Sequence, residues 1–537
     1  MTRRRAGAAL FVLGVVTLLL TAEVPTPERA AILNPLTGQP TSDTPLQRSL
    51  WLALGAALVA LLLGLPYALA VERWRVAGRR LLLVAGVTPL IVPPYLATIA
   101  WRGVFGPGGR VPLLLGWRPP PGPSVTVPSL VYTVPTGALL LGACLFPLVL
   151  FPAWAALRRL PASQLEAARL ARGLRGERAL LARALLPAAC AGALAVAALA
   201  LVEFALPQLL RIKVQSEQVY FAFQKEHDTA RALLLALRAS APLLGAAAAC
   251  AGGILLLPWG RRALGGSAPA TRPLSRPAQV AAWLGCLLAL APGAWLPLLD
   301  VALRLIHRPA PPGARVPQGL ARLRGVLEQA WTIGAPDAER SVWVGVLTAT
   351  LGVALALGLA WWARRAGALT LAAGAALAAL AVATPAPLVG MLVLVGLTQL
   401  KAYALLDGLG CLVLAHLLRF APLALVLIAV AARGLREERL EAARLAGRSP
   451  LLGVGLPQLA PTLLAAWALL YVLAVTEYSA TAVVEPPGQQ VLALFVVNQA
   501  HYGEVSELAG LCTLLLGVVL WPLPPLAGLA LWARRRA

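Results

Sequence analysis

Apolar stretches, many of them close to twenty residues long, alternate along this chain with shorter polar segments rich in arginine. At a rise of about 1.5 Å per residue, an apolar helix of that length spans a hydrocarbon core of roughly 30 Å. The pattern predicts an all-α polytopic membrane protein. About twelve spanning helices are expected, near residues 6–23, 49–70, 81–101, 129–154, 188–206, 230–256, 278–303, 341–362, 368–398, 406–431, 459–477 and 506–532.

The amino-acid composition agrees with a membrane protein, and the placement of its basic residues argues against nucleic acid as a partner. Hydrophobic residues make up 59% of the 537 residues and charged residues only 13%, far from the balance of a soluble domain. The net charge of +24 is compatible with nucleic-acid binding, but 28 of the 46 basic residues lie in the termini and alternate loops. The positive-inside rule therefore predicts that these loops and both termini face the cytoplasm. Lipid is the expected surrounding, and no nucleic-acid partner is predicted.

The first apolar stretch has two interpretations. Arg3–Arg5 precede an apolar run that ends near Thr21, which is also the pattern of a cleaved signal peptide. A retained anchor is favoured, because an even number of spans needs this helix.

Cysteine and lysine usage excludes several kinds of site. The six cysteines lie in or beside predicted spans without paired spacing in an external loop, so no disulfide or metal cluster is expected. None of the three lysines follows a glycine, so the chain has no phosphate-binding P-loop and is not itself an ATPase. No enzymatic activity and no cofactor are predicted for this chain.

The heptapeptide Leu-Glu-Ala-Ala-Arg-Leu-Ala occurs twice, at Leu165–Ala171 and, 275 positions later, at Leu440–Ala446. Two further residue pairs keep an offset of 274, Glu203 with Glu477 and His227 with His501. Because the chain holds only four histidines, finding two of them at this offset is informative. Repetition at a fixed interval indicates duplication.

The duplication predicts two parallel halves of six spans each. Residues 1–258 form the first half and residues 278–537 the second, joined by a cytoplasmic linker at 259–277 that is rich in glycine, proline and arginine. Six spans separate the two heptapeptides, so both are expected on the cytoplasmic face.

The second heptapeptide is followed by signals for a helix end and a new helix. Gly447 favours a stop directly after the heptapeptide, and Ser449 with Pro450 is typical of a capped helix start. The loop is therefore predicted to form a short helix, a turn and a second helix that returns to the bilayer.

The pattern Glu441-Ala-Ala, three residues, Gly447, then Leu456-Pro457 before a span resembles the cytoplasmic loop of binding-protein-dependent ABC transporter permeases. Further stretches are similar to the fused, double-length permeases of the iron(III) type, with thiamine permeases nearly as similar. These stretches are Pro89–Leu96, Glu477–Thr481, Pro486–Gly488 and His501–Gly503.

The resemblance implies a type I ABC importer permease in a bacterial inner membrane. Its implied partners are two cytoplasmic ABC ATPase subunits, which use the ATP, and a periplasmic or lipid-anchored solute-binding protein. The ATPases dock on coupling loops at 156–187 and 432–457. The implied coupling residues are Glu166, Ala167, Ala168, Gly173, Glu441, Ala442, Ala443 and Gly447. The first copy departs from the pattern, because Gly173 follows Glu166 by seven residues and not six.

Four residues are candidates for a solute path: Glu203, Glu477, His227 and His501. A carboxylate at the end of a span is costly to bury and suggests a pathway, although a hydrated structural acid is the alternative. Imidazole and carboxylate together suit iron. Arg419 and His416 also lie inside a predicted span, where a snorkelling or interhelical structural role is expected and transport chemistry is not.

Three functional classes remain open. The leading class is an ABC permease, for iron(III) or alternatively for thiamine or another small solute. A six-plus-six secondary transporter requires a coupling carboxylate near the bilayer midplane. A membrane-embedded transferase requires an acidic cluster in a large external loop, which the sequence lacks.

Overall fold

The computed structural model describes residues 32–33, 40–41, 44–74, 76–116, 130–256, 274–307, 318–364, 381, 384–502, 505–526 and 528–529. The predicted first span at 6–23 and most of the predicted linker at 259–277 lie outside these residues. The first part of the predicted span at 368–398 also lies outside them.

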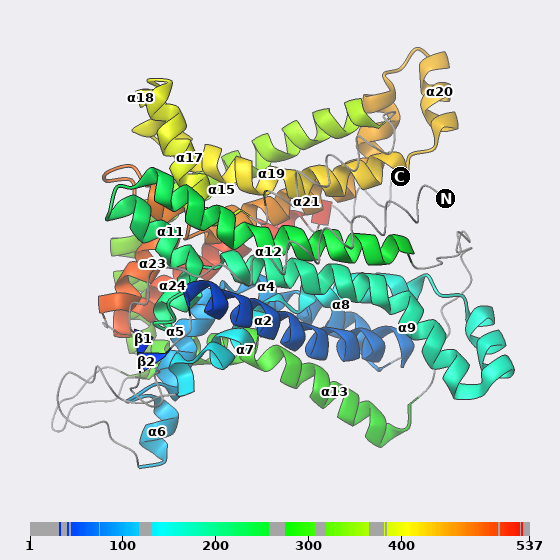
Figure 1. Ribbon diagram of the computed structural model, residues 1–537, viewed down its shortest axis with the longest axis horizontal. Helices are drawn as coiled ribbons and strands as arrows, with labels where there is room; N and C mark the ends of the chain where they lie inside the picture. The colour runs from blue at the N-terminus through cyan, green and yellow to red at the C-terminus, as the bar shows by residue number, and fades with distance from the viewer. Residues whose placement is uncertain are drawn as a thin grey trace. The chain divides into compact units, whose positions relative to one another are not determined.

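The described chain is almost entirely helical (Figure 1). Two short strands, β1 (Ile32–Leu33) and β2 (Pro40–Thr41), pair antiparallel. The first group of helices is α2 (Pro45–Ala68), η1 (Leu69–Arg73), α3 (Arg79–Ala85), α4 (Thr88–Ile91), α5 (Pro94–Phe105), α6 (Arg110–Leu114), η2 (Leu130–Tyr132), α7 (Val134–Leu145), α8 (Pro147–Arg158), α9 (Ala162–Val202), α10 (Ala205–Leu209), α11 (Gln215–Gln224), α12 (Thr229–Leu256), α13 (Arg276–Leu290) and η3 (Ala291–Trp295). The second group is α14 (Leu296–Ile306), α15 (Gly319–Ala363), α17 (Ala386–Gln399), α18 (Tyr403–Leu406), α19 (Gly410–Arg433), α20 (Glu437–Leu445), η4 (Leu451–Gly455), α21 (Leu456–Thr476), α22 (Thr481–Val484), α23 (Leu492–Tyr502) and α24 (Val505–Leu520).

Several helices have the length and composition of membrane spans. Seven helices of the described chain are long and apolar enough to cross a bilayer, and two bent pairs raise this number to as many as nine. The bends are 87° between Arg79–Ile91 and Pro94–Leu114, and 44° between Val134–Leu145 and Pro147–Arg158. The predicted all-α membrane fold is therefore confirmed in this coarse form, while the number of twelve spans stays a prediction.

Contacts divide the chain into two compact units. Unit 1 comprises residues 1–221 and 229–300, and unit 2 comprises residues 222–228 and 301–537. Residues 278–300 follow the predicted linker in sequence but group with unit 1. In unit 1 the indole nitrogen of Trp283 donates to the carbonyl oxygen of Ala77 at 2.9 Å, and that of Trp101 donates to Pro292 at 3.1 Å.

Small residues allow the helices of unit 1 to approach closely. Helix α2 packs against α7, α8 and α9. A Cβ atom added at Gly142 of α7 would lie 2.5 Å from the Cβ of Val59 on α2, which real side chains do not tolerate. In unit 2, α15 packs in the same manner against α19, α21 and α24, and Gly352 of α15 directly faces Leu470 of α21. Close packing of small residues is typical of helices that associate within a bilayer.

Five of the six cysteines are free thiols, and the side chain of Cys250 lies outside the described residues. The described thiols are Cys144, Cys190, Cys286, Cys411 and Cys512.

Candidate functional site

The first heptapeptide, Leu165–Ala171, lies in the first part of α9. Leu165 is buried, whereas Glu166 and Ala167 are exposed and Leu170 is 89% exposed. The helix presents one apolar anchor to unit 1 and turns its glutamate and second leucine outward. Figure 1 shows this part of α9 as a separate arm beyond a sharp break in the helix.

The break in α9 depends on glycine. Arg172 and Gly173 leave the helical region, with φ/ψ of −141°/18° and 59°/−149°. The positive φ at Gly173 strongly favours a residue without a Cβ. Three residues later, a Cβ at Gly176 would collide with the carbonyl oxygen of Ala168, so the two arms of α9 touch there. Gly173 makes the turn, and Gly176 allows the two arms to pack together.

The second heptapeptide, Leu440–Ala446, lies in α20 and just after it. Leu440 is fully buried and packs in an apolar cluster with Ala432, Leu435 and Leu459. Glu441 and Ala442 are exposed, Ala443 is buried, and Leu445 is 90% exposed. The first leucine of each heptapeptide is therefore buried and the second is exposed, in both units.

Helix α20 ends as the sequence predicts. Gly447 has a φ of 69°, its N–H donates to Arg444 at 2.9 Å, and the N–H of Arg448 donates to Ala443 at 2.8 Å. This pair of bonds around a left-handed glycine is the Schellman helix end. The hydroxyl of Ser449 then accepts from the N–H of Leu452 at 3.4 Å, where the next helix begins. The predicted stop and restart are confirmed.

Replacing Gly447 with alanine is expected to destabilise the end of α20 by about 1 kcal/mol, because a Cβ opposes a positive φ. Amide hydrogen exchange of residues 437–448 measures this as faster exchange. Gly453→Ala is the matched control, since a Cβ there makes an ordinary contact 3.7 Å from the side chain of Arg448. Equal exchange in the two variants would contradict the expectation.

Each heptapeptide presents a nearly fully exposed leucine beside an exposed glutamate. Exposing a leucine in water forgoes roughly 1.5–3 kcal/mol that its burial would contribute. An arrangement repeated in both units, with a buried leucine on one side and an exposed leucine on the other, suits docking against a partner surface.

The two predicted path acids have closely similar local geometry. Glu203 follows α9 with φ/ψ of −67°/134°, and Glu477 follows α21 with −73°/119°. A carboxylate oxygen of Glu203 accepts from the N–H of Leu206 at 3.3 Å, and one of Glu477 accepts from Ala480 at 2.9 Å. Each side chain thus caps the turn that follows its helix. Glu203 and Glu477, which the offset of 274 pairs in the sequence, therefore also have similar local structure.

Glu477 has a buried cationic partner. A guanidinium nitrogen of Arg419 on α19 lies 3.7 Å from its carboxylate, and both side chains are 10% exposed. On the same helix, His416 shares a hydrogen bond of 3.1 Å with the hydroxyl of Thr481, which itself donates to the carbonyl of Glu477. The interhelical role expected for Arg419 and His416 agrees with these contacts, although their partners could not be named from the sequence.

Unit 1 has a different residue at the position of Arg419. Counting back 275 positions gives Cys144, a buried thiol on α7. The thiol cannot supply the fixed positive charge that Arg419 supplies to Glu477. The two units therefore differ in the residue at this position, despite the shared backbone geometry of the two glutamates.

The predicted path histidines are exposed. His227 lies between α11 and α12 with a positive φ of 54°, and His501 lies near the end of α23 with its Nδ1 2.8 Å from the carbonyl oxygen of Val497. Within the described residues, no three His, Cys, Asp or Glu side chains lie close enough to hold a metal ion.

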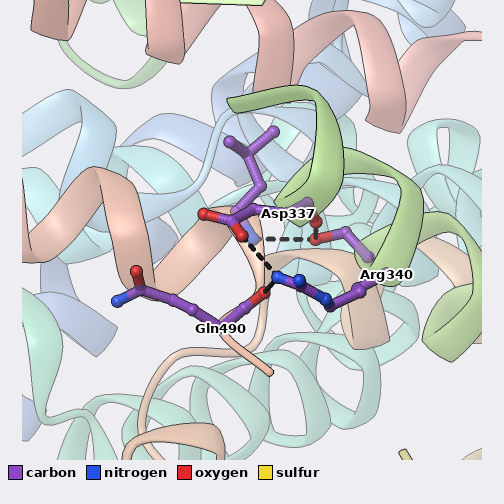
Figure 2. Close-up of polar contacts among 5 residues, drawn as sticks. Asp337, Arg340 and Gln490 are labelled. Atoms are coloured by element: carbon purple, nitrogen blue, oxygen red, sulfur yellow. Dashed lines mark hydrogen bonds and ion pairs between the residues drawn. The ribbon is translucent and has the colours of Figure 1, made fainter. Parts of the chain in front are cut away.

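A polar cluster that the sequence did not suggest lies at the start of the apolar part of α15 (Figure 2). Arg340 donates to Asp337 at 2.7 Å and to the backbone carbonyl of Gln490 at 3.1 Å. Burial raises the pKa of the nearby Glu485, with the Asp337 charge adding to this and Arg340 opposing it. This cluster joins α15 to the segment between α22 and α23.

One serine on α2 and one on α15 make the same kind of backbone contact in the two units. Ser341 accepts from the N–H of Leu492 at 2.8 Å, and Ser49 accepts from the N–H of Gln215 at 2.8 Å. Each serine also donates to the carbonyl four residues earlier in its own helix. The same kind of contact therefore occurs in both units, at residues that the heptapeptide offset of 275 does not align.

Comparison with protein-family models and with curated proteins finds no match to this chain.

Proposed function

We propose that this chain is the membrane permease of an ABC importer, driven by separate ATPase subunits that dock on the two heptapeptides. The observation that carries the proposal is the shared pattern at these segments. In both, the first leucine anchors the segment while the glutamate and the second leucine face outward. A partner with an apolar pocket and a cationic group would cover both outward side chains.

The proposed topology has twelve spans in two six-span halves, with both heptapeptides and both termini in the cytoplasm of a bacterial cell. Arginine placement supports this orientation. The equivalent capping by Glu203 and Glu477, and the equivalent serine contacts, support two related halves. The chain acts as a conduit and not as an enzyme, and the ATP belongs to its partners.

Iron(III) delivered by a periplasmic or lipid-anchored binding protein is the proposed solute, with thiamine as the alternative. Glu203 and Glu477 are the proposed path acids. The charge of Glu477 is offset by Arg419 at 3.7 Å, which weakens its attraction for a cation. The ion pair also makes Glu477 a poor coupling carboxylate for a secondary transporter.

Co-expression of the chain with the P-loop ATPases of its own genome tests the proposal. Reconstituted into liposomes with the matching binding protein, the complex is expected to accumulate solute only when ATP is present on the side of the heptapeptides. Iron(III) and thiamine are compared in parallel. Uptake that follows an ion gradient without ATP would overturn the proposal in favour of secondary transport.

A further inference from the structure

We infer that two ion pairs, Arg73–Glu177 and Arg364–Glu437, fasten each coupling loop to a long helix of its unit and carry loop movement into that helix. The helix is α2 with η1 for the loop at 156–187, and α15 for the loop at 432–457. The inference rests on the proposed function, because it assigns a role in transmitting ATPase movement. These four residues lie outside the coupling residues that the family resemblance names. They are positioning residues, since none of them is proposed to touch ATP or solute.

In unit 1, the fastening is buried. Arg73 ends η1, which continues α2, and its guanidinium lies 2.5 Å from the carboxylate of Glu177, with the side chains only 11% and 9% exposed. The preceding residue, Glu72, accepts from the indole N–H of Trp154 on α8 at 2.8 Å. Two consecutive charged residues at the end of α2 and η1 thus hold α8 on one side and the loop part of α9 on the other.

In unit 2, an arginine occupies the corresponding place at the end of α15. Arg364 stacks over the ring of Trp361 at 4.4 Å, and its Nε lies 3.5 Å from the carboxylate of Glu437 in the first turn of α20. The Arg364 side chain is 5% exposed and that of Glu437 is 54% exposed. Trp361 also packs against the apolar cluster that contains Leu440. An ion pair and an apolar contact therefore join α20 to the same end of α15.

The two fastenings hold different parts of their loops. Glu437 lies in the same uninterrupted helix as Glu441, so α20 is held directly beside its exposed docking residues. Glu177 lies beyond the break at Arg172–Gly173, on the other arm of α9 from Glu166. The coupling loop at 432–457 is therefore expected to move with α15 as one body. In the coupling loop at 156–187, the arm of α9 that carries Glu166 can pivot at Gly173 while Glu177 stays bound to Arg73.

The two pairs also differ in strength. Glu177 is 9% exposed, whereas Glu437 is 54% exposed, so solvent screens the attraction of Glu437 for Arg364 more than that of Glu177 for Arg73. Loss of coupling is therefore expected to be larger for Glu177→Gln than for Glu437→Gln.

The test uses the permease with its ATPases and binding protein in liposomes and measures solute transported per ATP hydrolysed. Glu177→Gln is expected to lower this ratio about fivefold or more, the range of typical coupling between sites. The reversed pair, Arg73→Glu with Glu177→Arg, is expected to restore it. Glu328→Gln is the matched control, because its exposed pair with Arg324 lies elsewhere and its loss should leave the ratio unchanged.

A second measurement does not depend on transport. Amide hydrogen exchange of residues 162–185 is expected to be faster in Glu177→Gln and to return to the wild-type rate in the reversed pair. A lower yield of folded protein with an unchanged ratio and unchanged exchange in the remaining complex would overturn the inference, since the pair would then serve stability alone.

Failure of the inference is distinct from failure of the proposed function. If the wild-type complex couples ATP to uptake and Glu177→Gln keeps the wild-type ratio, the fastening role is wrong while the permease function stands. If the wild-type chain binds no ATPase, the proposed function fails, and the inference with it.

Discussion

Glu477→Gln is expected to lower the free energy of unfolding by about 3–5 kcal/mol, which is the usual cost of removing one partner of a buried ion pair. The substitution leaves the guanidinium of Arg419 in a site where its side chain is only 10% exposed. A guanidinium does not lose its proton, so it cannot escape this cost by becoming neutral. Denaturant titration of the purified protein in mixed micelles measures the change.

The double variant Arg419→Met with Glu477→Gln distinguishes the ion pair from other effects of the substitution. Removing both charges is expected to recover most of the lost stability, because neither a cation nor an anion then remains buried. Glu328→Gln is the matched control, because its partner Arg324 is 83% exposed and the arginine charge stays hydrated when the glutamate charge is removed. Equal losses in the single and double variants would contradict this account.

The positions of the long helices followed from the sequence because span length and hydrophobicity are nearly sufficient to specify them. The predicted spans at 230–256 and 406–431 correspond to α12 (Thr229–Leu256) and α19 (Gly410–Arg433). In a bilayer each helix satisfies its own backbone hydrogen bonds, so such segments form largely independently of their partners.

The bends could not be predicted in the same way. The sequence treated 81–101 as one span, whereas Arg79–Ile91 and Pro94–Leu114 meet at 87°. Pro93 and Pro94 mark where a helix can break, since proline lacks an N–H and restricts the preceding residue. The size of a bend depends on packing against neighbouring helices, which no local pattern encodes.

The candidate site was predictable where its chemistry is local. The Schellman end at Gly447 and the cap at Ser449 are set by residues within a few positions of each other, and both were predicted. The partners of Arg419 and Arg73 are 58 and 104 positions away in the chain, so they emerge only when the helices pack. The contrast of Arg419 with Cys144 at an offset of 275 is a signal in the sequence that the two units differ at this position.

The double substitution Glu166→Lys with Glu441→Lys is expected to abolish ATPase attachment and ATP-driven uptake. Both glutamates are exposed. Each is proposed to accept a charge-assisted hydrogen bond from the ATPase, worth about 1.5–3 kcal/mol, and a lysine would replace that bond with repulsion. Affinity at each loop is therefore expected to fall by at least about tenfold. Co-purification of the ATPase and uptake into liposomes measure the two effects.

Glu328→Lys is the matched control for this experiment, because Glu328 is an exposed glutamate outside both heptapeptides and the substitution changes the charge by the same amount per site. It is expected to retain attachment, since Glu328 lies on α15 and the proposed docking surface is the side of α20 that carries Glu441 and Leu445. The exposed positions of Glu166 and Glu441 also predict that the lysine variants keep the unfolding midpoint of the wild-type chain. Loss of attachment in the control equal to that in the double variant would indicate a general charge effect and would remove the two glutamates from the docking surface.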